Sequence, residues 1–235
     1  MVIVNWLFLI VLATLPALLW FIFFSKAESH KEPKRLVLLT FLIGFFISSP
    51  TVLIQTILKE EIKYFWPAIN IFILIFVLAL VEELFKFIGA YWAVRKDPTF
   101  SEPIEAMFYM VSVALGFATV ENILIIAGDF NFHNPLILYQ SISTMALRFF
   151  GATFLHTLSS AVFGYYWAKG HIHKILFHFL LLGLILATSI HAIFNYLVLR
   201  FENSYLIYPT LFLLTISFFV VNDFSKLRAE KKKAF

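Results

Sequence analysis

A group of ionisable side chains lies within the longest apolar stretches of this sequence. An ionisable group at the centre of a bilayer costs roughly 2.5–3.5 kcal/mol on insertion scales, so such groups usually face a bundle interior or a water-filled cavity. One buried polar residue can serve only to hold two helices together, but a set of this size indicates a shared polar site. Its charged and imidazole members are Glu82, Glu83, Lys86, Glu121, Arg148, His156 and His191, and the amides Asn122 and Asn195 accompany them.

The spacing within this group predicts which side chains share a helical face. Glu82 precedes Lys86 by one helical turn, which is the favourable order for an ion pair along a helix. Glu83 is rotated by about 100° from Glu82, so it remains available to a reaction centre. His191 and Asn195 are also one turn apart, so Asn195 can orient the imidazole or donate a hydrogen bond to an oxyanion.

The chemistry that this group suggests is hydrolysis of a peptide bond. That reaction needs a water molecule, a base that activates it and hydrogen-bond donors for the tetrahedral oxyanion. Glutamate can be the base, and histidine or asparagine the donors. Ser159 and Ser160 lie one turn from His156, and we interpret them as packing residues rather than nucleophiles.

Other ways of cleaving a peptide bond in a membrane are excluded by the residues themselves. The sequence contains no HExxH zinc motif, no GxSxG motif and no cysteine. Its aspartates, Asp97, Asp129 and Asp223, lie outside the apolar stretches or at their edges, which removes a paired-aspartate mechanism.

The elements that must position these residues are membrane helices. Of the 235 residues 61% are hydrophobic and 14% are charged, whereas a soluble domain has roughly 45–50% apolar and about 25% charged residues. A helix needs about 20 apolar residues to cross a bilayer, and segments of this kind lie at about 2–24, 36–58, 66–94, 104–127, 136–168, 174–199 and 205–222. The sequence therefore predicts an all-α polytopic membrane protein, a single integral-membrane domain (1–235) with about seven transmembrane helices around a polar cavity.

The basic residues predict how these helices are oriented. Most Lys and Arg residues outside the helices fall in alternate connections and in the tail 226–233. The positive-inside rule then places the N-terminus outside and the C-terminus in the cytoplasm. Because the net charge of +4 arises in these flanking segments, the lipid bilayer and not nucleic acid is the expected partner.

Four short motifs resemble those of the PrsW family of intramembrane proteases, which is similar to the wider CAAX-protease/Abi superfamily. They are EExxK at 82–86, FxxxEN at 117–122, the single His156, and HxxxN at 191–195. The wider superfamily has EExxxR and FxxxH instead, so the sequence is closer to PrsW. The resemblance covers a motif-bearing core of about residues 80–198.

This resemblance implies an intramembrane endopeptidase of the bacterial cytoplasmic membrane, acting on a membrane-bound protein such as an anti-sigma factor. Glu82 or Glu83 is then the general base. The residues expected at the reaction centre are Glu82, Glu83, Glu121, His156, His191 and Asn195, with Lys86, Asn122 and Arg148 as their charge and hydrogen-bond partners.

Two questions stay open at this point. A zinc ion held by Glu121, His156 and His191 is one mechanism, and water activated by glutamate without a metal is the other. The same intramembrane Glu and His residues also suit a transporter or proton relay, although no inverted repeat is evident. A scaffold that binds a partner helix is a further alternative, but it would not need adjacent glutamates.

Overall fold

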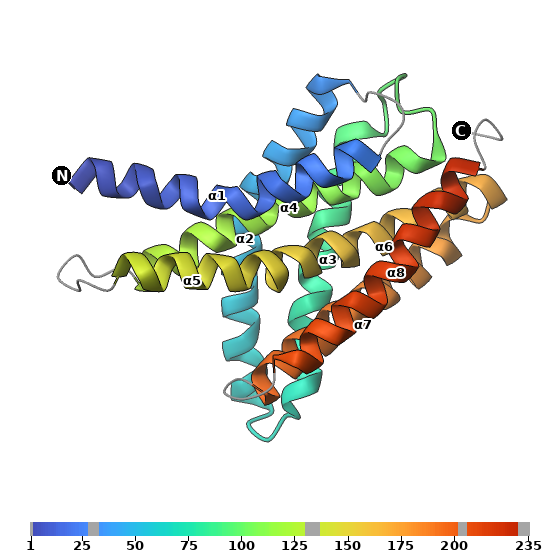
Figure 1. The fold of residues 1–235 in the computed structure, drawn as a ribbon. Coiled ribbons are helices and arrows are strands. Elements are labelled where there is room, and N and C mark those ends of the chain that lie inside the picture. Colours follow the sequence, from blue (N-terminus) through green and yellow to red (C-terminus); the bar gives the residue numbers. More distant parts are fainter. Residues whose placement is uncertain (1, 28–32, 130–136, 202–205, 230–235) are drawn as a thin grey trace.

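The structure, a computed structural model, describes residues 2–27, 33–129, 137–201 and 206–229 (Figure 1). These residues form eight α-helices and no strand, which confirms the predicted all-α class. The helices are α1 (Val2–Ala27), α2 (Lys34–Phe65), α3 (Ile71–Val94), α4 (Pro103–Asp129), α5 (Ile137–Phe150), α6 (Ala152–His173), α7 (Leu176–Arg200) and α8 (Ile207–Ala229).

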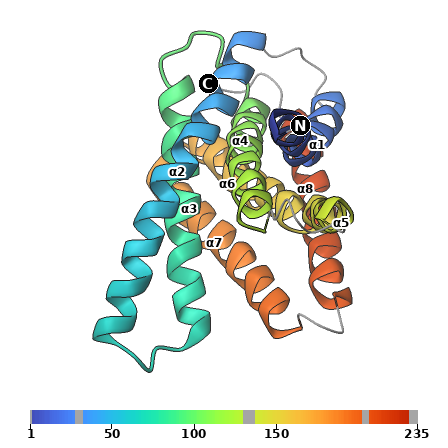
Figure 2. The same ribbon diagram turned by 90° about the vertical axis from the view of Figure 1, so that its left-hand side faces the viewer.

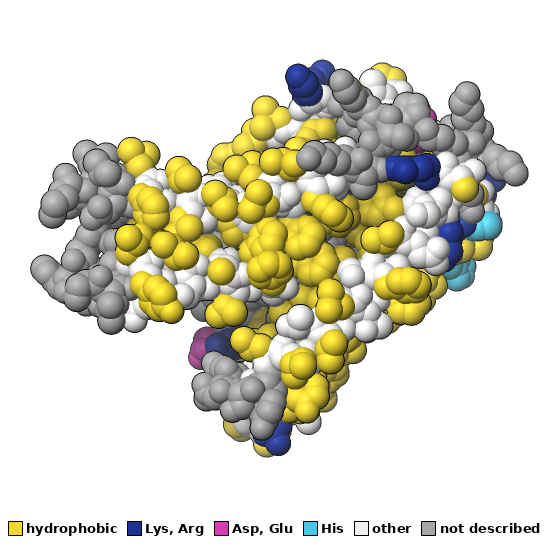
Figure 3. All heavy atoms as spheres, viewed as in Figure 1, with side chains coloured by type: hydrophobic (Ala, Val, Ile, Leu, Met, Phe, Trp, Pro, Cys, Tyr) yellow, Lys and Arg dark blue, Asp and Glu magenta, His cyan; other side chains and the backbone are white. Residues whose placement is uncertain are grey.

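Five of these helices are long and apolar enough to cross a membrane, as a polytopic membrane protein requires. They contain Leu7–Ser25, Lys34–Phe65, Pro103–Gly128, Leu176–Arg200 and Ile207–Ala229. Large apolar side chains cover the face seen in Figure 3, as lipid contact requires. The helices that carry the adjacent glutamates and His156, α3 and α6, are not among the five. The number of spans and their orientation therefore stay predictions.

The fifth predicted segment, 136–168, is two helices rather than one. Gly151 lies between α5 and α6, with φ −106° and ψ −99°. Glycine is a poor residue for the interior of a helix because it has the most backbone freedom to lose. A Cβ at this position would lie only 2.9 Å from the carbonyl oxygen of Leu147, so the bend also leaves little room for a side chain.

The centre of the molecule is formed by α4 and α6, which the other helices surround (Figure 2). Glycines allow close approach of the backbones. A Cβ on Gly44 of α2 would overlap the carbonyl oxygen of Val113, and one on Gly116 of α4 would overlap that of Phe41. Small residues at such crossings are typical of membrane helix packing. This packing places the polar residues of α4 and α6 in the protein interior.

Two helices that carry site residues, α3 and α4, begin at residues that favour the start of a helix. The side chain of Asn70 accepts a hydrogen bond of 2.8 Å from the backbone N–H of Phe72 and so caps the start of α3. Pro103 is the first residue of α4, where its missing N–H costs nothing.

Candidate active site

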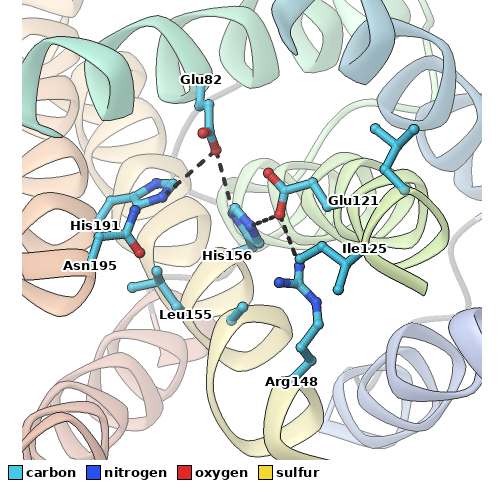
Figure 4. A pocket seen from close by; sticks show the side chains of 10 residues that line it. Glu82, Glu121, Ile125, Arg148, Leu155, His156, His191 and Asn195 are labelled. Carbon is cyan, nitrogen blue, oxygen red and sulfur yellow. Dashed lines mark hydrogen bonds and ion pairs between the residues drawn. The ribbon is translucent and has the colours of Figure 1, made fainter. Parts of the chain in front are cut away.

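Residues from α3, α4, α5, α6 and α7 meet around one pocket of about 320 Å³ (Figure 4). Its lining includes both polar and apolar residues. The polar ones are Glu82, Glu121, Arg148, His156, His191 and Asn195, and the apolar ones are Leu124, Ile125, Ala152 and Leu155. Among the predicted residues, Glu83, Lys86 and Asn122 are fully buried and lie behind this lining.

The Glu83 carboxylate contacts side chains of α3, α6 and α7. One of its oxygens, Oε1, lies 2.9 Å from Lys86 Nζ and 2.8 Å from His191 Nδ1, and it accepts a hydrogen bond of 3.1 Å from the Ser159 hydroxyl. The other oxygen, Oε2, accepts one of 3.4 Å from the Ser160 hydroxyl. Both oxygens of this carboxylate are therefore engaged by the protein.

Glu82 has a free oxygen at the pocket. Its Oε1 accepts a hydrogen bond of 2.8 Å from Gln55 Nε2, while Oε2 is buried and makes no hydrogen bond. Oε2 lies 3.7 Å from His191 Nε2 and 3.9 Å from His156 Nδ1. Dashed lines mark both contacts in Figure 4.

The ion pairing of Lys86 differs from the prediction based on spacing, which paired it with Glu82. Lys86 is closer to Glu83, at 2.9 Å, than to Glu82, at 3.7 Å. The rotation of about 100° between adjacent residues on a helix turns Glu83 toward α6 and α7 and Glu82 toward the pocket. Spacing along α3 allows both pairings with Lys86, and the neighbouring helices decide between them.

Each histidine contacts a carboxylate with one ring nitrogen. His156 Nε2 lies 2.8 Å from Glu121 Oε2, and His191 Nδ1 lies 2.8 Å from Glu83 Oε1. Because a carboxylate only accepts hydrogen bonds, these two nitrogens carry the protons. In the neutral rings the opposite nitrogens are then unprotonated. His156 Nδ1 accepts a hydrogen bond of 2.8 Å from Lys86 Nζ and lies 3.9 Å from Glu82 Oε2, whereas His191 Nε2 lies 3.7 Å from this oxygen.

A chain of polar contacts extends from His156 to α1. Arg148 Nη2 lies 3.1 Å from Glu121 Oε2, and Arg148 Nε donates to the side-chain oxygen of Asn122. Asn122 Nδ2 in turn donates to the carbonyl oxygen of Ala13 at 3.0 Å. Asn122 therefore supports Arg148 from outside the pocket.

Glu82, His156 and His191 could hold a metal ion. One ligand atom from each lies within 4.8 Å of the others, and two imidazoles with one carboxylate are a zinc-binding set that leaves a position for water. The unpartnered Glu82 Oε2 and the carboxylates behind both histidines fit this role, since metal-binding histidines usually donate their other N–H to such a partner. His156 Nδ1 would have to exchange its hydrogen bond of 2.8 Å from Lys86 Nζ for the metal. Glu121, the third ligand in the sequence-based hypothesis, contacts the opposite nitrogen of His156.

Sequence reasoning missed Gln55 and assigned Ser159 and Ser160 only to packing. All three donate to the adjacent glutamates. The signal for Gln55 is an amide among apolar residues of α2, but nothing in the order of residues indicates that it faces Glu82.

Comparisons with known proteins identify the family. The family model described as PrsW family intramembrane metalloprotease matches residues 32–222. Protease PrsW of Geobacillus kaustophilus (strain HTA426) is 31% identical over 182 residues, which cover 77% of this chain and 75% of that protein. Protease PrsW of Bacillus subtilis (strain 168) is 25% identical over 209 residues, or 88% and 89% of the two chains.

Protease PrsW of Clostridioides difficile (strain 630) is 26% identical over 196 residues, which cover 81% of this chain and 79% of that protein. No solved structure matches the chain. The relatives are proteases and not transporters, which agrees with the hydrolytic chemistry expected from the intramembrane residues. The chain is a member of the PrsW family of intramembrane metalloproteases.

Proposed function

We propose that this protein hydrolyses a peptide bond of a membrane-bound protein in the pocket between α3, α4, α5, α6 and α7, and that Glu82 activates the water. The observation that carries this proposal is the environment of Glu82 Oε2. This atom is buried, has no hydrogen-bond partner and lies 3.7 Å from the unprotonated His191 Nε2 and 3.9 Å from His156 Nδ1, which accepts a hydrogen bond from Lys86. A water molecule bound among these three groups has a base beside it.

The reaction needs one proton transfer in each direction. Glu82 Oε2 takes a proton as the water oxygen bonds to the carbonyl carbon of the substrate, which produces a tetrahedral oxyanion. Asn195 and Arg148, both at the pocket wall, carry N–H groups that stabilise this oxyanion. The carbon–nitrogen bond then breaks, and the proton on Glu82 passes to the leaving nitrogen. The products are a carboxylic acid and an amine.

Glu83 and Glu121 act through the histidines. Their contacts of 2.8 Å to His191 Nδ1 and His156 Nε2 select the tautomers and set the ring orientations. Both are therefore positioning residues in this proposal.

The family description implies a metal ion, and the three residues facing the pocket fit zinc. Glu82, His156 and His191 would hold it. With zinc bound there, Glu82 would be a ligand and not the base, and the ion would lower the pKa of its water ligand and polarise the scissile carbonyl instead.

The proposed substrate is a membrane-bound protein of the bacterial cytoplasmic membrane. Leu124, Ile125 and Leu155 add apolar surface to the pocket lining, which suits an apolar substrate segment. An anti-sigma factor with a membrane-spanning segment is the substrate class suggested by the motif resemblance, and the relatives from Bacillus subtilis and Clostridioides difficile are bacterial proteins.

Glu82→Gln is expected to lower cleavage about 100-fold or more, because it removes the base with little change in shape. The chain is expressed in a Bacillus subtilis strain that lacks its own Protease PrsW, and the N-termini of membrane proteins are determined by mass spectrometry. New N-termini inside or beside membrane-spanning segments should appear with the wild type. Glu61→Gln, at an exposed position of α2, is the matched control. If E82Q produced the same termini as E61Q, the proposal would be wrong.

Zinc content tests the metal hypothesis separately. Protein purified in detergent is expected to retain about one zinc ion per chain, and the double variant His156→Ala, His191→Ala should retain none, because two of the ligands are removed. Elemental mass spectrometry measures both. An active wild-type protein that contains no zinc, and that keeps its activity in the presence of a chelator, would contradict the hypothesis.

A further inference from the structure

We propose that Gln55 of α2 is a positioning residue for the reaction, because it holds one oxygen of Glu82 so that the other faces both histidines. This inference rests on the proposed function, since it assumes that Glu82 takes part in the chemistry. Gln55 lies outside all four motifs and belongs to a helix that contributes no residue to the pocket lining.

The amide of Gln55 is fixed by two contacts to α3. Its Nε2 donates to Glu82 Oε1 at 2.8 Å and to the carbonyl oxygen of Leu78 at 2.9 Å. Both partners only accept hydrogen bonds, so the nitrogen of the amide, not its oxygen, must face them. Leu78 lies one turn before Glu82 on the same helix, so the amide bridges the backbone of that turn and the carboxylate at its end.

Gln55 is a polar residue on a stretch of α2 with exposed apolar neighbours, so its amide depends on hydrogen bonds within the protein. Leu53, Ile54 and Ile57 on the same stretch of α2 are exposed large apolar residues, as lipid-facing positions are. An amide at such a place needs a hydrogen-bond partner within the protein. Here one of its partners is the carboxylate with the free oxygen.

Lys86 makes the position of Glu82 sensitive to Gln55. The fully buried Lys86 ammonium lies 3.7 Å from Glu82 Oε2, just beyond hydrogen-bond distance. Without the Gln55 donor, rotation of the Glu82 carboxylate toward Lys86 would gain a charge-assisted hydrogen bond. The oxygen that faces the histidines would then be engaged and unavailable to water.

The test compares Gln55→Met with Thr56→Val. Methionine keeps the length of the side chain but has no donor. Thr56 is an exposed neighbour whose hydroxyl bonds only within α2, to the carbonyl oxygen of Val52. The probe is a fluorogenic peptide with about 20 apolar residues, taken from the most abundant cleavage site found in the Bacillus subtilis membrane.

Q55M is expected to lower kcat about 10–100-fold, as loss of such a supporting contact does, with KM within about twofold of the wild type. T56V should match the wild type. In a Glu82→Asp background, where the shorter side chain is withdrawn from Gln55, Q55M should change kcat less than about threefold. Equal losses in both backgrounds, or a Q55M variant as active as T56V, would refute the positioning role.

A crystal structure of Q55M separates this inference from the proposed function. We expect Glu82 Oε2 to lie within about 3 Å of Lys86 Nζ. An unchanged Glu82 carboxylate in Q55M would overturn the inference, whether or not the peptide is cleaved. If E82Q cleaved the peptide as the wild type does, the proposed function would fail, and the position of Glu82 in Q55M would still decide the role of Gln55.

Discussion

Two adjacent glutamates have opposite environments in this protein. Glu83 is completely buried and bonded through both oxygens, whereas Glu82 keeps one oxygen without a partner. A buried carboxylate beside a buried ammonium mainly compensates charge. A carboxylate with a free oxygen at a pocket can accept a proton. Residues of one chemical type thus acquire different tasks from the groups around them.

Glu83→Leu is expected to lower the free energy of unfolding by about 3–5 kcal/mol, because it leaves the buried Lys86 ammonium without its closest counter-charge. Glu83→Leu combined with Lys86→Met should recover most of that loss while remaining inactive. Thermal unfolding in detergent measures the first effect and peptide cleavage the second. Glu61→Gln again serves as control, and an E83L variant as stable as that control would speak against the charge argument.

At the scale of the elements, the bend between α5 and α6 positions Arg148. Trp20 of α1 contacts this bend, because its Nε1 donates to the carbonyl oxygen of Phe149 at 2.8 Å. Its ring stacks on Phe149 and Phe154, with centroids 5.1 and 4.2 Å apart. Although α1 lies outside the residues that the family model matches, 32–222, it supports the last turn of α5 and, through Asn122, the side chain of Arg148.

Trp20→Phe is expected to loosen this bend, since it keeps an aromatic ring but removes the N–H donor. Loss of one such hydrogen bond costs about 1 kcal/mol, so we expect faster hydrogen exchange in peptides that cover residues 147–155 and kcat reduced about fivefold. Mass spectrometry after deuterium labelling detects the exchange. Trp92→Phe, at a position where the side chain is 67% exposed, is the control, and identical exchange in both variants would contradict a role for Trp20.

At the scale of the whole molecule, one of the five candidate spans is enclosed by the other helices. The apolar part of α4 is 72% buried within the protein, while the corresponding parts of the other four candidate spans are 17–28% buried. The outer helices therefore present apolar surface to lipid, and α4 carries Glu121 and Asn122 in the interior. In Figure 1 the beginnings of α2 and α4 and the ends of α3, α6 and α8 lie at the upper right. Lys34 begins α2, and Arg95 and Lys174 directly follow α3 and α6. The positive-inside rule predicts that helix ends with such basic residues face the cytoplasm.

The order of residues was enough to predict the helical membrane class, the group of acids and histidines that the structure brings together, and the family. Apolar length and helical spacing are properties of one segment at a time, so they can be recognised without knowing its neighbours. The break at Gly151, the roles of Gln55 and Trp20, and the choice of Glu82 over Glu83 at the pocket depend on which helices lie side by side. Spacing determines the direction of a side chain around its own helix, whereas its partners come from other helices, so only the packed structure determines those contacts.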